Sequence, residues 1–361
     1  MADAQAIRAA ARDEAAPVRV FLDLTHLGRH VTGIERVTIE QFEGVDFAGA
    51  EVIAVRANGL LSLVLRQQIW LPLLALFHPK AMFVFPGFPP SPLFALASNR
   101  VILYVHDLFL ITRWADLGLK ARLYMAWPFA FAAKRLKHFQ VNSEKTAAEL
   151  APFVRRDARI SLYRPGVRNV FGLEPGDRAQ RASAVSALSI VALGTVEPRK
   201  NYGAALAILD ALAARGLPAH LHIIGREGWG HAQAALAAHP AVSIHGYLEA
   251  ARVKVILEAA DLYLCTSHDE GLGLPLLEAQ YAGLALVAPD KAVFHEALGA
   301  SALLIDPANA QASAAAIGRL VSVPDWRVRT TAASLANVAR WNTQAALDRA
   351  AARQMFAGRN R

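Results

Sequence analysis

The alternation of apolar and polar segments along the chain predicts two successive α/β domains. In the first half, apolar runs rich in Val, Ile and Phe mostly end in a polar residue or a glycine, and they lie near 18–24, 52–55, 82–87, 101–107 and 138–143. Runs of this kind are typical of buried parallel strands with functional residues at their carboxyl ends. The stretches 118–136 and 144–153 are predicted to be helices.

The same alternation restarts after a small, polar segment at 173–188 that lacks apolar periodicity and is the predicted linker. Strands are predicted at 189–196, 219–225, 241–246, 261–267, 284–288 and 301–305, with helices between and after them. We therefore expect two Rossmann-like, doubly wound parallel sheets facing each other across a cleft. The expected divisions are a first domain at 1–172, the linker at 173–188, a second domain at 189–345, and a C-terminal helix at 346–361 that packs back on the first domain.

Composition narrows the class of protein. The chain has 361 residues, of which 54% are hydrophobic and 19% are charged, so it is globular and long enough for two cores. Its single cysteine, Cys265, excludes an intramolecular disulfide and a cysteine-ligated metal cluster. The first 17 residues mix acids with bases and contain no continuous apolar block, so they do not resemble a signal peptide. A cytoplasmic location is expected.

The net charge of +8 indicates an anionic partner, which could be nucleic acid, nucleotide phosphates or an acidic membrane. Neither a helix-turn-helix nor an RNA-binding signature is evident, so no nucleic-acid partner is expected. Residues 60–98 contain no acid, and bases alternate with aromatic residues at 113–137. The longest apolar run, 69–77, is shorter than the roughly 20 residues that span a bilayer. These segments either dock on a membrane surface or form interior and solvated helix faces.

Two glutamates, Glu270 and Glu278, flank a glycine-containing turn in the segment HDEGLGLPLLEAQY. Pro275 suits the first helical position, so the predicted helix begins just after the glycines and places Glu278 in its first turn. Glu270 is then available to the hydroxyls of a sugar, and Glu278 to those of a ribose. Three backbone N–H groups would be available to a diphosphate or to sugar hydroxyls: those of Gly271, Leu272 and Gly273. Alternatively, the two glutamates only favour the helix N-terminus electrostatically.

A second segment, LGTVEPRKNY, ends a predicted strand at Gly194 and places Arg199 and Lys200 in the loop that follows. Two adjacent cations at the carboxyl end of a parallel strand suit a pyrophosphate, whose charge grows as a nucleoside diphosphate leaves. The alternative is a solvated basic pair.

Together these segments resemble glycosyltransferase family 4, whose members are retaining enzymes with the two-domain GT-B architecture. The family has two glutamates spaced as Glu270 and Glu278 are, preceded by an Arg-Lys pair as at 199–200. Four further segments resemble the family's glycine loop, histidine motif, last strand before the linker and domain junction: GIERV at 33–37, VHD at 105–107, VNSEKT at 141–146 and RPGV at 164–167.

The resemblance implies roles for individual residues. Arg199 and Lys200 would bind the diphosphate, Glu278 the ribose, and Glu270 with the backbone at 271–273 the donor sugar. His106 would lie beside the reacting carbon, although a histidine at a strand end is more often structural. Gly33 belongs to the glycine loop, but the family often has two consecutive glycines there, whereas Gly28 and Gly33 are five apart. No two aspartates stand two positions apart, so no metal and no cofactor are expected.

The function implied by the resemblance is retaining transfer of a hexose from a nucleotide diphosphate sugar, with GDP-mannose as the first candidate donor. The N-terminal domain would bind the acceptor, a saccharide or a lipid-linked saccharide in surface polysaccharide synthesis, and the C-terminal domain would bind the nucleotide sugar. Such an enzyme could lie peripherally on the inner face of the plasma membrane. The alternatives are a catalytically silent scaffold that binds nucleotide sugars and a glycogen-phosphorylase-like enzyme, which would need a lysine carrying pyridoxal phosphate.

Overall fold

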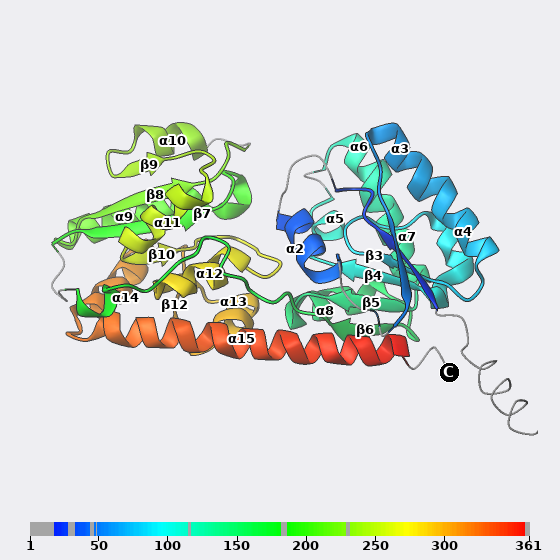
Figure 1. The fold of residues 1–361 in the computed structure, drawn as a ribbon. Helices are drawn as coiled ribbons and strands as arrows, with labels where there is room; N and C mark the ends of the chain where they lie inside the picture. Colours follow the sequence, from blue (N-terminus) through cyan, green and yellow to red (C-terminus); the bar gives the residue numbers. More distant parts are fainter. Residues whose placement is uncertain are drawn as a thin grey trace, which may run out of the picture. The chain divides into compact units, whose positions relative to one another are not determined.

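The computed structural model describes residues 18–27, 33–43, 47, 49–114, 117–181, 186–228 and 232–357. The chain forms two compact units (Figure 1): unit 1 comprises Met1–Pro165 and Leu347–Arg361, and unit 2 comprises Gly166–Ala346. Each unit contains one six-stranded parallel sheet flanked by helices. These sheets confirm the predicted α/β fold class.

The sheet of unit 1 has the strand order β2-β1-β3-β4-β5-β6. Its strands are β1 (Arg19–Asp23), β2 (Glu51–Val55), β3 (Met82–Phe85), β4 (Val101–Val105), β5 (His138–Val141) and β6 (Arg159–Leu162). Every residue of β3 and β4 is buried, as a parallel sheet covered on both faces requires. The predicted strands correspond to β1–β5. Sequence reasoning missed β6, an edge strand that contains Arg159 and Ser161 and in which no residue is fully buried.

The helices of unit 1 include two long ones, each with a wider π turn in it. The elements are α2 (Gly33–Phe42), α3 (Leu60–Leu65), η1 (Arg66–Trp70), α4 (Leu71–Phe77), η2 (Pro92–Arg100), α5 (Phe109–Thr112), α6 (Leu119–Ala121), η4 (Arg122–Ala126), α7 (Trp127–Arg135), α8 (Glu144–Leu150) and η5 (Ala151–Phe153). Pro72 and Pro128 each lie just after a π turn. A proline has no N–H for the residue four positions earlier, so the preceding turn widens and the helix continues.

The sheet of unit 2 has the order β12-β11-β10-β7-β8-β9. Its strands are β7 (Leu188–Leu193), β8 (Ala219–Ile224), β9 (Val242–Ile244), β10 (Leu262–Leu264), β11 (Ala285–Pro289) and β12 (Ala302–Ile305), and all of them were predicted. Counted within the unit, the order is 6-5-4-1-2-3, which is the order of the doubly wound nucleotide-binding fold. The direction of winding reverses between β7 and β10, so a ligand site is expected at their carboxyl ends.

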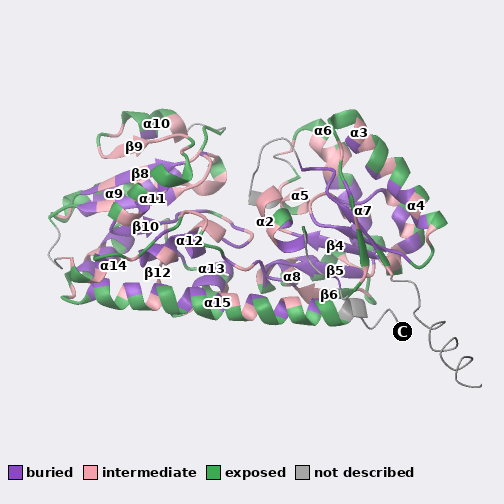
Figure 2. Ribbon diagram, viewed as in Figure 1, coloured by how far each residue is buried: buried purple, intermediate pink, exposed green. Residues whose placement is uncertain are grey.

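The helices of unit 2 cover both faces of its sheet. Strands β10 and β11 are buried throughout, whereas the edge strands β9 and β12 are mostly intermediate (Figure 2). The helices are α9 (Tyr202–Ala214), α10 (Ala232–Ala238), α11 (Ala250–Ala259), α12 (Leu274–Ala279), α13 (Ala292–Leu298), α14 (Ala310–Ser322) and α15 (Trp326–Ala357), with short turns η6 (Arg178–Gln180), η7 (Pro198–Lys200), η8 (Gln280–Ala282) and η9 (Gly299–Ser301). The last residues of α15, from Leu347, belong to unit 1, where Asp348 pairs with Arg164 at 2.9 Å.

The segment expected to be a linker, 173–188, belongs to unit 2, since the boundary between the units lies at Pro165 and Gly166. Arg178 in this segment is buried, and its guanidinium donates to four backbone carbonyls, those of Leu257, Glu258, Ala260 and Ala282. The described part of this polar segment therefore packs on unit 2 through the buried Arg178 and Leu173.

Candidate functional site

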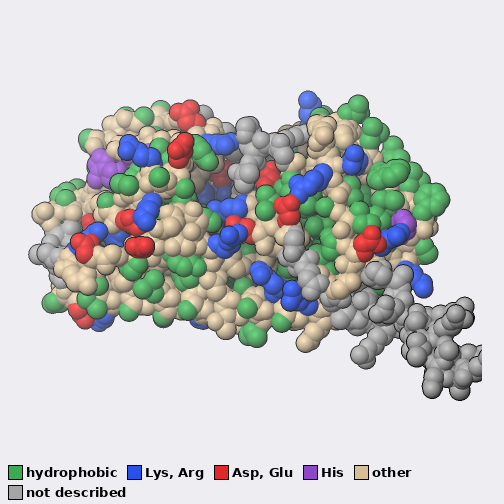
Figure 3. Space-filling view, viewed as in Figure 1, with side chains coloured by type: hydrophobic (Ala, Val, Ile, Leu, Met, Phe, Trp, Pro, Cys, Tyr) green, Lys and Arg blue, Asp and Glu red, His purple; other side chains and the backbone are tan. Residues whose placement is uncertain are grey.

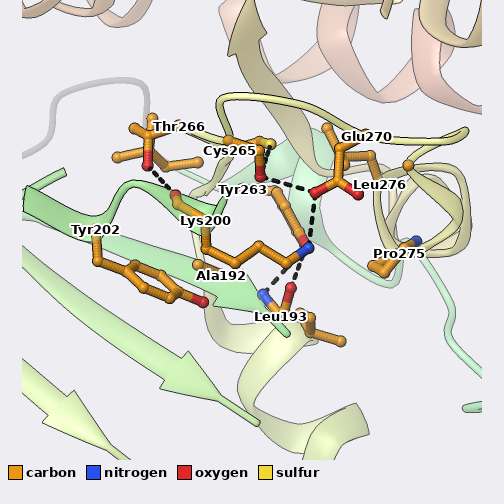
Figure 4. Close-up of a pocket in the computed structure, with 13 residues that line it drawn as sticks. Ala192, Leu193, Lys200, Tyr202, Tyr263, Cys265, Thr266, Glu270, Pro275 and Leu276 are labelled. Carbon is orange, nitrogen blue, oxygen red and sulfur yellow. Dashed lines mark hydrogen bonds and ion pairs between the residues drawn. The ribbon is translucent and has the colours of Figure 1, made fainter. Parts of the chain in front are cut away.

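A pocket lies where β7 and β10 end, at the point where the sheet of unit 2 reverses its winding (Figure 4). Three of the predicted site residues line it: Lys200, Glu270 and Gly273. The other lining residues are Ala192, Leu193, Tyr202, Tyr263, Leu264, Cys265, Thr266, Ser267, Pro275 and Leu276. The pocket occupies the position at which doubly wound folds bind their ligands.

The carboxylate of Glu270 is held by three donors. Lys200 Nζ lies 2.7 Å from Oε1, Arg199 Nη1 lies 2.7 Å from Oε2, and the hydroxyl of Ser267 donates to Oε1 at 2.7 Å. Burial would raise the pKa of Glu270, but the two cations and these hydrogen bonds lower it to about 2. Glu270 is therefore ionised at neutral pH, although only 7% of the residue is exposed.

Arg199 is paired with carboxylates on both sides. Its guanidinium donates to Glu197 Oε1 at 3.0 and 2.7 Å, to Glu270, and to the carbonyl of Asp269 at 3.0 Å. The two cations and the two carboxylates thus cancel in formal charge. The alternative of a solvated basic pair is wrong, since the side chains of Arg199 and Lys200 are only 20% and 13% exposed. Of the two, Lys200 is the one that lines the pocket.

The chain around Lys200 is shaped by two unusual backbone positions. Gly194 has φ 140°, and a Cβ there would lie 2.8 Å from Lys200 Cε, so only glycine leaves room for this side chain along the strand end. Asn201 adopts the left-handed conformation with φ 51° and separates the turn that ends at Lys200 from α9, which begins at Tyr202. Figure 4 shows the resulting course of Lys200, whose amino group is directed at the carboxylate of Glu270.

Several residues of the pocket were missed by sequence reasoning. Thr266 Oγ1 donates to the carbonyls of Lys200 and Asn201, each at 3.0 Å, and so ties the loop after β10 to the loop after β7. The hydroxyls of Tyr202 and Tyr263 bond the backbone where β7 ends. Thr266 and Ser267 are the last two residues of the strand predicted at 261–267, so the strand-end rule would have indicated them.

The second glutamate, Glu278, occupies a different position from the predicted one. Helix α12 begins at Leu274, after Gly273 with φ 80°, so Pro275 is its second residue and Glu278 lies in its second turn. Glu278 is 5% exposed and is not among the lining residues of the pocket. The alternative that both glutamates only stabilise the helix N-terminus fails for Glu270, which pairs with two cations, and for Glu278, which lies beyond the first turn.

The backbone of the glycine-containing turn lies beside the pocket. Gly273 lines it directly, while Leu272 is 4% exposed and packs in the core of unit 2. Gly271 already takes part in an interaction within the protein. Because α12 has only six residues, the partial positive charge at its N-terminus is smaller than that of a longer helix.

His106 and Gly33 belong to unit 1. His106 follows β4, and its Nε2 lies 2.7 Å from the carbonyl of Pro86. Since a carbonyl only accepts, Nε2 carries the proton and Nδ1 is the acceptor atom. Burial is the main cause that lowers the pKa of His106, to about 4, so the imidazole is neutral at neutral pH. Gly33 is the first residue of α2, and Gly28 lies outside the described residues.

A buried polar cluster at the end of β1 was also missed. Asp23 accepts hydrogen bonds from the hydroxyl of Thr25 at 2.6 Å and from Gln67 at 2.7 Å, and burial raises its pKa. The ring of His26 covers Gly87, where a Cβ would lie 2.3 Å from Nε2. Burial lowers the pKa of His26. Among the described residues, no group of three or more His, Cys, Asp or Glu side chains is arranged to hold a metal ion.

Comparison with known proteins identifies the domain that carries the pocket. Residues 187–322 match the family described as glycosyl transferases group 1. Residues 187–322 of unit 2 are therefore similar to group 1 glycosyltransferases. The matched region includes all the residues that line the pocket. The match confirms the resemblance to glycosyltransferase family 4 that was inferred from the glutamate pair and the Arg-Lys pair.

One curated relative matches over a limited length. The serotype-specific mannosyltransferase WbdA of Escherichia coli is 30% identical over 132 residues, which are 35% of this chain and 16% of WbdA. The matched region thus represents about a sixth of the length of that relative.

Solved structures share the fold over nearly the whole chain. Sucrose-phosphate synthase from Thermosynechococcus elongatus superposes with a TM-score of 0.67 at 16% identity, over 94% of this chain and 100% of that one. HepE from Anabaena, in a structure with UDP-glucose, gives 0.61 at 16% identity over 91% and 98%. WaaG, a glycosyltransferase involved in lipopolysaccharide biosynthesis, gives 0.60 at 16% identity over 93% and 98%. The chain therefore has the GT-B fold.

Proposed function

We propose that this protein is a retaining glycosyltransferase that moves a hexose from a nucleotide diphosphate sugar to a saccharide or a lipid-linked saccharide. The observation that supports this most is the ion-pair network of Lys200, Arg199 and Glu270 at the switch point of a unit similar to group 1 glycosyltransferases. A lysine and an ionised glutamate at one pocket suit the two halves of the donor, an anionic diphosphate and a sugar rich in hydroxyls.

We propose a different role for each residue of this network. Lys200 is the mobile cation, since its single ammonium can turn from Glu270 to an arriving diphosphate and remain there as the leaving group gains charge. Arg199 is fixed by Glu197 and by the carbonyl of Asp269, so it holds Glu270 in place. The carboxylate of Glu270, ionised at neutral pH, accepts hydrogen bonds from the sugar hydroxyls and orients the donor.

The proposed reaction needs no carboxylate nucleophile. In a front-face route, the leaving diphosphate itself takes the proton of the acceptor hydroxyl while the sugar passes through an oxocarbenium-like state. His106 is neutral, with its proton directed at Pro86, so it can accept a hydrogen bond at Nδ1 but does not act as a cation. The work of the protein in this route is orientation and charge stabilisation.

The candidate donor is GDP-mannose, and the candidate pathway is the synthesis of a surface polysaccharide. The 30% identity to a serotype-specific mannosyltransferase over 132 residues supports mannose. UDP-sugars are the competing class, because HepE has the same fold and its structure contains UDP-glucose.

Two measurements on the full chain test the proposal. A thermal-shift screen of nucleoside diphosphates identifies the base, because a ligand at 100 times its dissociation constant adds about 2.7 kcal/mol to stability. The matching nucleotide sugar is then incubated with saccharide acceptors, and release of the nucleoside diphosphate is followed. Binding without release or transfer, over a panel of acceptors, would instead support the silent scaffold. A purified protein that carries pyridoxal phosphate would support the phosphorylase-like alternative.

A further inference from the structure

One helix of unit 1 carries a continuous apolar surface on its outward side. The elements α3, η1 and α4 form a single helix, Leu60–Phe77, of 18 residues with a mean hydropathy of 1.6, and only 28% of this segment is buried. Its most exposed apolar side chains include Leu61 at 73%, Leu76 at 70% and Phe77 at 75%. By length and composition it is the one helix in the described part of the chain that could cross a membrane.

The opposite side of this helix belongs to the core of unit 1. Leu63 and Leu71 are buried at 3% and 0% exposure, and Gln67 is buried at 1%. The amide of Gln67 donates to Asp23 at 2.7 Å and accepts from the hydroxyl of Tyr124 at 3.1 Å. A helix anchored along its length by core contacts and by a buried amide lies on the surface of its domain. Its outward side is then suited to the plane of a membrane interface, not to a crossing.

A neighbouring turn extends the apolar surface. Leu93 and Leu96 of η2 are 57% and 87% exposed, and they line one apolar pocket together with Ile69, Leu73 and Leu76 of the helix. Figure 3 shows hydrophobic side chains gathered over α3 and α4. We call this the apolar face; its exposed members are Leu60, Leu61, Leu65, Ile69, Trp70, Leu73, Leu76, Phe77, Leu93 and Leu96. Soluble monomers rarely expose contiguous apolar areas of this kind without a partner.

The charges around the apolar face indicate which partner covers it. Residues 60–106 contain no Asp or Glu, and both Arg66 and Lys80 are exposed. In a symmetric contact between two copies of this face, the same cations would meet without an acid to pair with. An anionic bilayer instead supplies an apolar interior for the leucines and phosphates for the cations.

We propose that the apolar face of unit 1 docks on the surface of an anionic lipid bilayer. The inference rests on unit 1 alone and is independent of the proposed transfer reaction. Leu61, Leu76, Phe77 and Leu96 enter the boundary between headgroups and acyl chains, and Arg66 and Lys80 meet the lipid phosphates. Docking would hold the protein where a lipid-linked acceptor is displayed.

The test is flotation of the full chain with vesicles of phosphatidylcholine containing 30% phosphatidylglycerol, compared with pure phosphatidylcholine, at low and high salt. Wild-type protein is expected to float with the anionic vesicles at low salt and much less at high salt. The double variant Leu76→Glu, Leu96→Glu is expected to lose at least 90% of this binding. Changing Arg66 and Lys80 to Gln weakens binding about fivefold per cation.

A matched control separates the apolar face from general hydrophobicity. Val255 and Leu347 are 62% and 59% exposed and lie outside the face, so the variant Val255→Glu, Leu347→Glu should float like wild type. Circular dichroism and thermal unfolding confirm that the exposed substitutions preserve the fold. Absence of flotation with anionic vesicles overturns the proposal, as does equal flotation of both double variants. A dimer in light scattering that Leu76→Glu, Leu96→Glu dissociates would assign the face to a second copy.

Discussion

The substitution Glu270→Gln isolates the charge of the carboxylate at the centre of the pocket. The pKa of Glu270 is lowered from 4.5 to about 2, chiefly because Lys200 and Arg199 outweigh the opposing effect of burial. The difference of about 2.5 between these values corresponds to about 3 kcal/mol of stability at pH 7. Since the folded pKa is depressed, this contribution is complete above the unfolded value and is lost as pH falls toward 2.

Urea unfolding of wild type and Glu270→Gln, followed by circular dichroism, measures this contribution. We expect the variant to be less stable by about 3 kcal/mol at pH 7 and by about 2 kcal/mol at pH 3.5, where part of the advantage of the ionised form is lost. The control Glu149→Gln removes a partly exposed partner of Lys145 and should cost at most about 1 kcal/mol. Equal stability of wild type and Glu270→Gln at pH 7 would refute the ion-pair network as the cause of the lowered pKa.

The same variant also separates binding from turnover. Replacing the carboxylate leaves Lys200 and Arg199 with an excess of positive charge, so a nucleoside diphosphate should bind at least as tightly as it does to wild type. Transfer should fall, because a neutral amide orients the sugar hydroxyls less strongly than a carboxylate. Calorimetric titration with the nucleoside diphosphate, together with the transfer assay, measures both effects. Loss of nucleotide affinity in Glu270→Gln would show that the carboxylate itself contacts the nucleotide.

Three further predictions concern metal, stability and pH. Chelation with EDTA should leave transfer largely unchanged, because the diphosphate is assigned to protein cations; complete loss that manganese or magnesium restores would contradict this. Arg178→Ala should destabilise unit 2 by about 3 kcal/mol in urea unfolding, since four buried carbonyls lose their donor, whereas the more exposed Arg181→Ala should cost about 1 kcal/mol or less. His222 and His245 stack beside His220, and burial and these neighbours lower the pKa values of His222 and His245 below 6.5. The folded state favours the neutral imidazoles, so thermal stability should fall as pH drops below about 6.5. The fall should be smaller when His222 and His245 are both changed to Gln. If the double variant lost stability with pH as wild type does, the prediction would be wrong.

Strand positions were predictable because buried parallel strands are nearly continuous apolar runs, as β10 and β11 of unit 2 are. Strand β6 was missed because an edge strand such as Arg159–Leu162 is only partly buried and carries polar residues. The helix Leu60–Phe77 was missed for a related reason. Arg66, Gln67 and Gln68 interrupt its apolar run, and only tertiary structure shows that Gln67 turns inward to Asp23.

The site was predictable in part of its residues but not in its electrostatics. The Arg-Lys pair and Glu270 lie in the loops after β7 and β10, as the sequence predicts, whereas Glu278 lies in the second turn of α12 and does not line the pocket. Sequence spacing does not reveal that Glu270 pairs with Arg199, since the two residues lie 71 positions apart and meet only when β7 and β10 become neighbours. The burial of Arg178 was not predictable either, because this residue lies in a polar segment without apolar periodicity.

The proposed function is sugar transfer at the Lys200 and Glu270 pocket with retention of configuration. The most direct measurement follows the reaction of a nucleotide sugar with an acceptor by proton NMR, which reports both product formation and the anomeric configuration of the new bond. Wild type should form a product with the same anomeric configuration as the donor, while Lys200→Ala should keep a normal circular dichroism spectrum and lose most transfer at saturating donor. A product of inverted configuration, or a Lys200→Ala variant with turnover close to wild type, would contradict the account.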